Sequence, residues 1–229
     1  MDVSLPLLFC PLCRLKALTL FHSVAIKNLT RSYYHCPTCD LVSVPRQDHP
    51  DRETEKARYV AHNNDPNDPD YRAFLGRLWD EMEPRLAPCA KGLDFGSGPG
   101  PTLSLLGKES GFEVKIYDPF FSPDQSVLQS RYDFITCSET AEHFSDPAKE
   151  FNTFHRLLLP GGILGVMTGM LEDWKDFPEW HYHRDETHIS FYSKRSMDWI
   201  ASQYGWQVSF PKENVALFQK PGEQKGFRE

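Results

Sequence analysis

A glycine-rich loop that follows a short apolar run is the feature that most constrains how this chain folds. The segment Gly92–Pro101 reads GLDFGSGPGP, and the run Leu93–Phe95 near its start predicts a buried strand. Strand and helix patterns then alternate as far as Met167. Such alternation is typical of parallel strands joined by helical crossovers. The chain is therefore predicted to form an α/β fold in which helices cover both faces of an open sheet.

The elements expected around this loop fill the middle of the chain. Apolar residues at helical spacing before the loop predict an amphipathic helix that ends near Pro84, and a shorter helix is expected at Glu53–Ala61. Only about fifteen residues separate Tyr117 from Tyr132, too few for a full helix–strand–helix unit, so one sheet edge is predicted to be abbreviated. The amphipathic stripe is Tyr71, Phe74, Leu75, Leu78, Trp79 and Met82; the later elements are helices at Pro101–Ser110 and Pro147–Leu158 and strands at Val114–Tyr117, Tyr132–Cys137 and Gly162–Met167.

Two C-x-x-C pairs near the start predict a small metal-bound module. Cys10 and Cys13 form the first pair, and Cys36 and Cys39 form the second after 22 intervening residues. Two such knuckles supply the four thiolates of a tetrahedral zinc site. Strand patterns at Ala17–Val24, Ser32–His35 and Leu41–Val44 complete the signature of a zinc ribbon. The alternative is a pair of disulfides or idle thiols, which a reducing compartment disfavours.

Composition and charge limit the class of protein and its partners. The chain has 229 residues and a net charge of −7, which argues against binding a polyanion through overall charge alone. No apolar run approaches the roughly 20 residues of a membrane span, and the N-terminus lacks a signal-peptide pattern, so a cytoplasmic protein is expected. The predicted divisions are a zinc ribbon (1–45), a helical linker and lid (46–90), the sheet domain (91–220) and a flexible tail (221–229).

The glycine loop excludes two common ligands. A phosphate-binding P-loop carries a Lys and a Ser or Thr after its last glycine, whereas here Pro101 follows Gly100. The dinucleotide fingerprint G-x-G-x-x-G needs a third glycine where Pro101 stands. Asp118, at the end of the second strand, is placed to accept hydrogen bonds from two ribose hydroxyls. NAD and S-adenosylmethionine both offer such a ribose, so Asp118 does not choose between them.

Motifs further along the chain distinguish between these two ligands, because they resemble those of a known family. ETAEHFSDP follows the strand at Tyr132–Ser138, and RLLLPGG precedes the next strand. Together with the D-x-G-x-G-x-G loop and Asp118, they resemble class I S-adenosylmethionine-dependent methyltransferases over roughly residues 90–220. The stretch Ser138–His143, SETAEH, looks most like the ubiquinone-biosynthesis O-methyltransferase branch. The resemblance implies a Rossmann-like sheet and S-adenosylmethionine as cofactor.

The resemblance also implies which residues hold the cofactor. Asp94 and the loop glycines would shape the loop against the methionine end, and Asp118 would hold the ribose. Phe120 or Phe121 would cover the adenine, although the family's usual acidic residue before the fourth strand is missing. Tyr71 would close over the cofactor or, equally, pack as a core aromatic. The expected set is Tyr71, Asp94, Gly96, Ser97, Gly98, Asp118, Pro119, Phe120 and Ser138.

Three residues after the strand at Tyr132–Ser138 are candidates for the chemistry. Methyl transfer to a hydroxyl needs alignment of the nucleophile and removal of its proton. Glu139, Glu142 and His143 lie past a strand C-terminus, where open α/β sheets bind ligands. Glu139 and His143 are spaced to share one face of a helical turn, and His143 is the predicted base. One alternative is a divalent metal held by all three, as the resemblance suggests; another is that Glu142 and His143 only cap and brace the next helix.

An aromatic segment after the fifth strand is expected to wall the acceptor pocket. Trp174–Tyr192 concentrates histidines, tryptophans and other aromatic residues in what reads mostly as loop. Tyr182, His183 and His188 are candidates to contact the acceptor or to replace His143 as the base, and His188 is included in the predicted catalytic set; aromatic packing under a loop is the other interpretation. Cys137 lies near the nucleophile position of RNA cytosine-5 methyltransferases, but no Pro precedes it, so buried packing is predicted.

Three functions remain open at this point. The leading one is a methyltransferase that acts at oxygen on a small or medium-sized acceptor. The second is an rRNA or tRNA methyltransferase recruited through the ribbon, although the ribbon's basic residues are few. The third is a non-catalytic scaffold that retains a cofactor pocket. No DNA partner is expected. The basic residues of the ribbon are Arg14, Lys16, Lys27 and Arg31.

Overall fold

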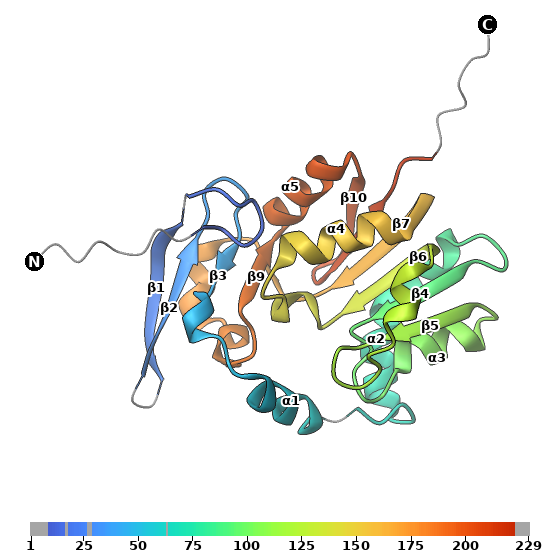
Figure 1. Ribbon diagram of the computed structural model, residues 1–229, viewed down its shortest axis with the longest axis horizontal. Helices are drawn as coiled ribbons and strands as arrows, with labels where there is room; N and C mark the ends of the chain where they lie inside the picture. Colours follow the sequence, from blue (N-terminus) through green and yellow to red (C-terminus); the bar gives the residue numbers. More distant parts are fainter. Residues whose placement is uncertain (1–8, 17, 27–28, 63, 223–229) are drawn as a thin grey trace, which may run out of the picture.

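The largest element of the molecule is a six-stranded sheet (Figure 1). The computed structural model describes residues 9–16, 18–26, 29–62 and 64–222. The strand order is β10–β11–β7–β6–β4–β5, with β4 to β7 parallel and the β10–β11 hairpin antiparallel to β7. This confirms the predicted α/β fold. The strands are β4 (Lys91–Phe95), β5 (Glu113–Tyr117), β6 (Tyr132–Ser138), β7 (Leu158–Met167), β10 (Gln207–Lys212) and β11 (Val215–Gln219).

Helices cover both faces of this sheet, as predicted. Helices α2 (Pro69–Met82) and α3 (Thr102–Glu109) pack on one face, and α4 (Pro147–Leu157) and α5 (Lys194–Tyr204) on the other. The strands between them are apolar at successive positions because each position serves one face in turn. In β11, for example, Val215 packs with the α2 side and Ala216 with the α4 side.

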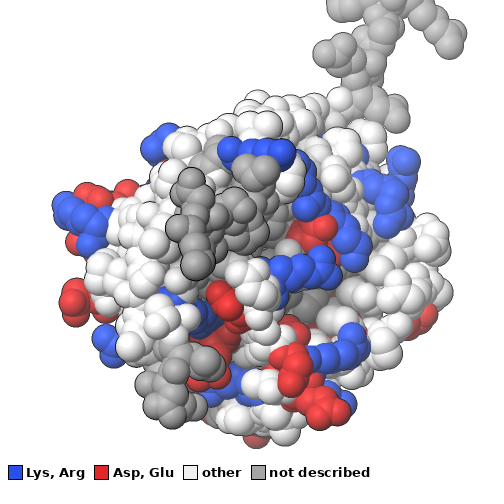
Figure 2. All heavy atoms as spheres, turned by 60° about the vertical axis from the view of Figure 1, so that its left-hand side comes forward, with Lys and Arg blue, Asp and Glu red and all other residues white. Residues whose placement is uncertain are grey.

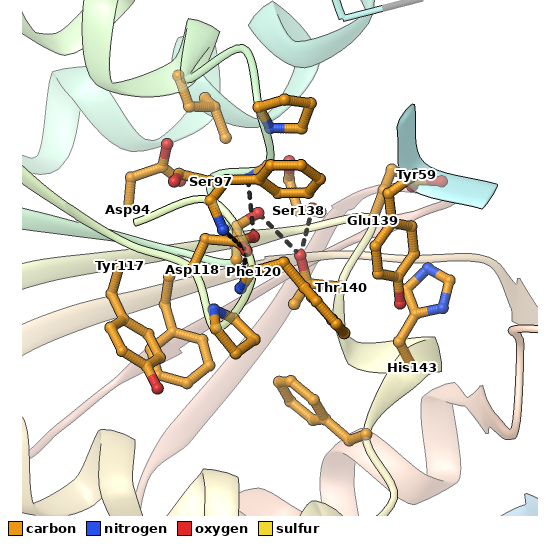
Figure 3. A pocket seen from close by; sticks show the side chains of 18 of the residues that line it. Tyr59, Asp94, Ser97, Tyr117, Asp118, Phe120, Ser138, Glu139, Thr140 and His143 are labelled. Atoms are coloured by element: carbon orange, nitrogen blue, oxygen red, sulfur yellow. Dashed lines mark hydrogen bonds between the residues drawn. The ribbon is translucent and has the colours of Figure 1, made fainter. Parts of the chain in front are cut away.

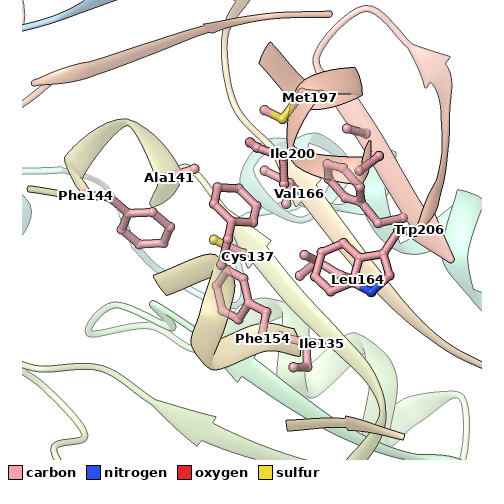
Figure 4. Packing of buried hydrophobic residues seen from close by; sticks show 14 of the residues in the cluster. Ile135, Cys137, Ala141, Phe144, Phe154, Leu164, Val166, Met197, Ile200 and Trp206 are labelled. Carbon is pink, nitrogen blue, oxygen red and sulfur yellow. The ribbon is translucent and has the colours of Figure 1, made fainter. Parts of the chain in front are cut away.

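The core on the α4 and α5 face contains Cys137 (Figure 4). Its side chain lies on β6 among Ile135, Val166 and Ile200 and is fully buried. Burial raises the pKa of this thiol well above its ordinary value, so it stays neutral and unreactive. The prediction of a packing role for Cys137 is confirmed.

The sheet edge at β5 is abbreviated, also as predicted. Between Tyr117 and Tyr132 the chain forms one bridge, Asp118 to Ser122, and a short 3-10 helix at Gln125–Gln129. No further strand follows β5 on this side, because the connection is too short to cross over.

A second sheet joins the N-terminal module to the larger domain. Its order is β1–β2–β3–β9–β8, so the strands near the cysteines continue directly into two strands from the segment after β7. Val42 pairs with Phe191, and Ser43 pairs with Ser190. This shared sheet is absent from our sequence-based expectations, which treat the module as separate and Trp174–Tyr192 as mostly loop. The strands are β1 (Thr19–Ile26), β2 (Leu29–His35), β3 (Val42–Ser43), β8 (Met170–Leu171) and β9 (Ser190–Ser193).

Helix α1 (Arg52–Val60) connects the N-terminal module to α2 and lies across the space between the two sheets (Figure 1). Asp51 caps it by accepting a hydrogen bond from the Thr54 amide, and none of its residues is buried. At the other end of the chain, the predicted flexible tail lies almost wholly outside the described residues, which stop at 222. Within those residues, no helix is long and apolar enough to cross a membrane.

Candidate active site

A cavity of about 760 Å³ opens at the carboxyl ends of β4, β5 and β6. Its volume lies within the range of small-molecule sites, and its position is where open α/β sheets bind ligands. The cavity wall includes the whole expected cofactor-binding set and the predicted catalytic residues, although not the further candidates Tyr182 and His183. The predicted residues in the wall are Tyr71, Asp94, Gly96, Ser97, Gly98, Asp118, Pro119, Phe120, Ser138, Glu139, Glu142, His143 and His188.

The glycine loop lies very close to neighbouring segments at two of its glycines. Gly96 has a φ of 79°, and a Cβ there would overlap the side chain of Thr140. The Thr140 hydroxyl donates to the Gly96 carbonyl at 3.2 Å. A Cβ at Gly100 would overlap the carbonyl oxygen of Asn64 in the linker. Glycine is needed at both positions because any side chain would displace a neighbouring segment.

Asp118 holds the loop and the turn after β5 together. One carboxylate oxygen accepts from the Gly98 amide at 3.0 Å; the other accepts from the amides of Phe120 at 2.8 Å and Phe121 at 3.0 Å. A carboxylate offers about four lone-pair sites, so about one remains for a ligand. For Asp118 to accept two ribose hydroxyls, as expected, one of these amide contacts would have to be released.

Asp94 lies beneath the loop and is almost completely buried. Its carboxylate accepts a hydrogen bond from the Thr136 hydroxyl at 2.9 Å. Burial, which disfavours the ionised form, raises the pKa of Asp94 to about 6. Near pH 7 the fold therefore holds a buried negative charge that is only partly compensated.

Ser97 supplies a direct sign that the cavity takes a polar ligand. Its side chain is 9% exposed, and its Oγ has no hydrogen-bond partner among the described residues. An unsatisfied buried hydroxyl costs about 1–3 kcal/mol, so such groups in native proteins ordinarily meet a ligand or water. Ser97 and the aromatic rings of Tyr59 and Phe120 fit a cofactor that carries both polar groups and a flat base.

His143 and His188 lie side by side, with ring centroids 4.9 Å apart. His143 Nδ1 lies 2.9 Å from the Thr187 carbonyl oxygen, and His188 Nδ1 lies 2.7 Å from the Tyr182 carbonyl oxygen. A carbonyl only accepts, so both Nδ1 atoms carry a proton, and neither Nε2 atom has a hydrogen bond within the described residues. Burial lowers the pKa of His188, which keeps its ring neutral.

The two glutamates differ from each other in position. Glu142 is fully buried on a 3-10 turn, Ala141–His143, where it accepts hydrogen bonds from the hydroxyls of Thr168, at 2.8 Å, and Tyr182. Glu139 precedes the turn with a φ of 46°, so it does not share a helical face with His143 as expected. Burial, and secondarily the charge of Glu142, raise the pKa of Glu139 well above its ordinary value.

The potential metal ligands in the cavity are also different from the expected trio. Glu142, His143 and His188 bring their ligand atoms within 4.8 Å of one another, and Glu139 is not part of this group. Tyr182 and His183, predicted to contact the acceptor, are absent from the cavity wall. Tyr182 instead braces Glu142, and His183 packs against the rings of Phe177 and Tyr33.

Helix α1 adds residues that the sequence-based prediction missed. Tyr59 lies 5.0 Å from the His143 ring and 5.7 Å from the Phe120 ring, centroid to centroid (Figure 3). Arg52 donates to the Pro119 carbonyl at 2.8 Å and lies over Phe120. Arg52, Glu55 and Tyr59 all line the cavity at the i, i+3, i+7 spacing of one helix face, a signal that was available in the sequence.

The four cysteines of the two C-x-x-C pairs form a second site. Their Sγ atoms all lie within 4.8 Å of one another, and the two nearest pairs are 3.4 and 3.5 Å apart. Tetrahedral zinc–sulfur bonds of about 2.3 Å place sulfurs about 3.8 Å apart, so the cluster is compatible with zinc. The two knuckles match: Arg14 and Asp40, one residue after each pair, both have φ near 60° and donate to the carbonyls of Cys10 and Cys36. None of the six cysteines forms a disulfide in this structure.

Comparisons with known proteins agree with this geometry. A family model described as a methyltransferase domain matches residues 43–209. Ubiquinone biosynthesis O-methyltransferases are similar to this chain. That of Pseudomonas paraeruginosa is 30% identical over 93 residues, which are 41% of this chain and 40% of the relative. That of Azotobacter vinelandii is 34% identical over 70 residues, which are 31% of this chain and 30% of the relative. The chain thus spans about two fifths or less of these relatives.

Solved structures show the same fold at low identity. An O-methyltransferase family protein from Burkholderia thailandensis superposes with a TM-score of 0.51 at 14% identity, covering 78% of this chain and 66% of that one. A putative S-adenosylmethionine-dependent methyltransferase from Methanococcus maripaludis gives 0.51 at 15% identity, covering 77% and 96%. The chain therefore belongs to the methyltransferase domain family, and its larger domain has the fold seen in these methyltransferase structures.

Proposed function

We propose that this protein transfers the methyl group of S-adenosylmethionine to a hydroxyl oxygen of a small or medium-sized acceptor. The observation that carries the proposal is the pair of histidines, His143 and His188, whose Nδ1 atoms are bonded to backbone carbonyls and whose Nε2 atoms are left for an acceptor in the same cavity as the glycine loop. A hydroxyl nucleophile needs such a base, and a sulfonium methyl donor needs no further activation. The similarity to ubiquinone biosynthesis O-methyltransferases supports oxygen as the methylated atom.

Each part of the cavity has a role in this reaction. The cofactor supplies an activated methyl group, and Ser97, Asp118 and the glycine loop hold and orient it. His143 takes the proton of the acceptor hydroxyl at Nε2, because its Nδ1–H is fixed to the Thr187 carbonyl. Tyr59 and α1 cover the site and limit the entry of water.

A metal-assisted form of the same reaction is the second candidate. Two imidazoles and one carboxylate, from His143, His188 and Glu142, are ligands that suit zinc, manganese or iron better than magnesium. Both Nδ1–H groups are tied to carbonyls, the usual outer-sphere arrangement of metal-bound histidine. A divalent cation there would lower the pKa of the acceptor hydroxyl. Chelator-treated protein that regains methyl transfer with added Mn²⁺ would favour this form.

The contacts of the ribbon's basic residues weaken the alternative of an RNA methyltransferase recruited through the ribbon. Arg31, one of the ribbon's basic residues, is buried, and its guanidinium donates to backbone carbonyls of the same chain. Arg14 pairs with Asp146, and Lys27 lies outside the described residues. On the ribbon side of the molecule, Lys and Arg alternate with Asp and Glu (Figure 2).

We also propose that the four-cysteine cluster holds one structural zinc ion. A closed set of four thiolates leaves no open position for substrate, so the metal would stabilise the fold rather than take part in methyl transfer. Metal binding to such a small module contributes to its folding directly.

Calorimetry with S-adenosylmethionine, followed by transfer of a labelled methyl group to catechol-type acceptors, tests the proposal. We expect the native protein to bind the cofactor and Asp118→Ala to lose binding, because the loop loses its brace. His143→Gln should keep cofactor affinity within about twofold and lose at least 100-fold in transfer, a typical contribution of a general base. His181→Gln, an exposed histidine in the same segment as His188, is the matched control and should retain activity. Absence of cofactor binding by the native protein would refute the proposal.

A further inference from the structure

Arg31 occupies an unusual position for an arginine on a zinc-ribbon strand. It lies on β2, and its side chain is 7% exposed. Its guanidinium donates to backbone carbonyls, and the charges of Glu186 and Asp185 also favour its ionised form. A buried guanidinium needs several acceptors to offset its lost hydration. These acceptors all come from one short segment of the larger domain.

The acceptors are four carbonyl oxygens between residues 183 and 188. One terminal nitrogen of Arg31 donates to the carbonyls of His183, at 3.4 Å, and Asp185, at 2.9 Å. The other donates to the carbonyls of Glu186, at 3.0 Å, and His188, at 2.6 Å. The segment therefore curls around the guanidinium, much as a loop wraps a bound cation.

This curled segment determines where both active-site histidines lie. His188 is its last residue, and the Thr187 carbonyl accepts from His143 Nδ1 and so selects the tautomer of that ring. Neither contact involves a side chain of the ribbon directly. The ribbon acts on this segment through its backbone, at the carbonyls that Arg31 holds and, just after His188, where the Val44 amide donates to the Ile189 carbonyl.

A second donor from the same strand supports the anchor. The Tyr33 hydroxyl donates to the His183 carbonyl at 3.0 Å, and the Arg31 guanidinium lies 5.4 Å from the Tyr33 ring centre. Strand β2 ends at His35, and the zinc-knuckle residue Cys36 follows at once. The position of β2, and with it Arg31, is thus tied to the four-cysteine cluster.

We propose that Arg31 is a positioning residue for the acceptor side of the active site, and that the zinc ribbon is thereby an integral part of that site. Arg31 sets the backbone of residues 183–188, which in turn sets the Nε2 atoms of His143 and His188. The anchoring follows from the contacts alone; its consequence for methyl transfer rests on the proposed function. Cofactor binding, which depends on the glycine loop and Asp118, is independent of it.

Arg31→Lys is the sharpest variant, because it keeps the charge and removes the planar fork. A lysine ammonium is compact, has three donors and cannot reach four carbonyls at these positions. Arg195→Lys is the matched control: Arg195 contacts Asp40 of the second knuckle, lies largely exposed and has no recorded bond to the 183–188 segment.

Hydrogen exchange followed by mass spectrometry reads the anchor without any acceptor. We expect amides of 183–189 to exchange at least tenfold faster in Arg31→Lys and unchanged in Arg195→Lys, with β6 and β7 unaffected in both. S-adenosylmethionine affinity should stay within about threefold, and with an acceptor kcat should fall at least tenfold at constant cofactor KM. Methylguanidine, added at millimolar concentration to Arg31→Ala, should slow the exchange again.

Three results would overturn the anchor: unchanged exchange in 183–189, equal acceleration throughout the sheet, or the same change in Arg195→Lys. If Arg31→Lys does not fold, Tyr33→Phe replaces it, since it deletes one donor to the His183 carbonyl and leaves the charge. Local acceleration in that variant supports the proposal, and unchanged exchange refutes it. Failure of the native protein to bind S-adenosylmethionine contradicts the proposed function alone, because the exchange result does not depend on it.

Discussion

Replacing Asp94 by asparagine should make the protein more stable at neutral and alkaline pH. The folded protein raises the pKa of this buried carboxyl from 3.8 to about 6. A difference of about two units, at 1.36 kcal/mol each, corresponds to about 3 kcal/mol. Because the pKa of Asp94 is raised, the folded state favours the neutral acid over the ionised form. The contribution of Asp94 to the free energy of unfolding is therefore complete below about pH 4, declines as the pH rises, and is lost above about pH 6.

The Asp94→Asn variant would avoid this loss, because an amide has no charge to bury. The amide oxygen can still accept from the Thr136 hydroxyl, so the main hydrogen bond survives. The gain over the native protein should reach at most about 3 kcal/mol at pH 8 and about half of that at pH 5. For a chain of this size, that corresponds to a rise in Tm of up to roughly 6–12 °C at pH 8.

Thermal and urea unfolding of both proteins at pH 5 and pH 8 provide the measurement. The comparison between variants at one pH cancels any effect of pH on the four-cysteine cluster, because both proteins carry that cluster unchanged. Thr136→Val should act in the opposite direction, destabilising the native protein more at pH 8 than at pH 5, since the hydroxyl stabilises the ionised form. A stability difference between the Asp94→Asn variant and the native protein that does not change with pH would show that the reasoning is wrong. The same variant should bind S-adenosylmethionine more weakly, because a costly buried charge at a ligand site is expected to serve the ligand.

Three further predictions concern the loop and the metal. Gly96→Ala should lower cofactor affinity more than tenfold by calorimetry, because its Cβ meets Thr140; Gly111→Ala, with a φ of 89° and no atom within 4 Å of the new Cβ, should lose stability and keep affinity. Ser97→Ala should weaken cofactor binding severalfold without loss of Tm, and stronger binding would contradict a ligand hydrogen bond at its Oγ. Metal analysis of reduced protein should give about one zinc per chain, which Cys39→Ser should remove together with much of the stability.

Local patterns in the sequence were sufficient to predict most of the larger domain. The stripe from Leu75 to Met82 predicted helix α2 because its spacing matches the helical period, and the buried face contains the residues expected. The alternation after Phe95 predicted the parallel strands because crossovers of that length permit few other arrangements. The glycines and the C-x-x-C pairs were informative for a different reason: each residue type there meets a backbone or ligand requirement that few others meet.

Long-range pairing explains what the sequence could not predict. Strand β3 has two residues and pairs with β9 almost 150 positions later, so no local periodicity indicates the shared sheet. The group of potential metal ligands contains His188 where Glu139 was expected, and the cause is the same. The position of His188 depends on how the 183–188 segment curls around Arg31. The left-handed backbone of Glu139 was equally hidden, since glutamate rarely adopts it.

The shared sheet changes how the role of the ribbon has to be tested. Deleting residues 1–45 would remove β3, the edge on which β9 pairs, and Arg31, on which the 183–188 segment is wrapped. Loss of activity in such a truncation is therefore expected whether or not the ribbon recruits a partner. Substitution of exposed ribbon residues separates the two roles: Lys16→Glu and Leu20→Ser alter the outer surface and leave Arg31 in place. Methyl transfer that survives these changes on a small acceptor, but fails with Arg31→Lys, would assign the ribbon to the architecture of the active site.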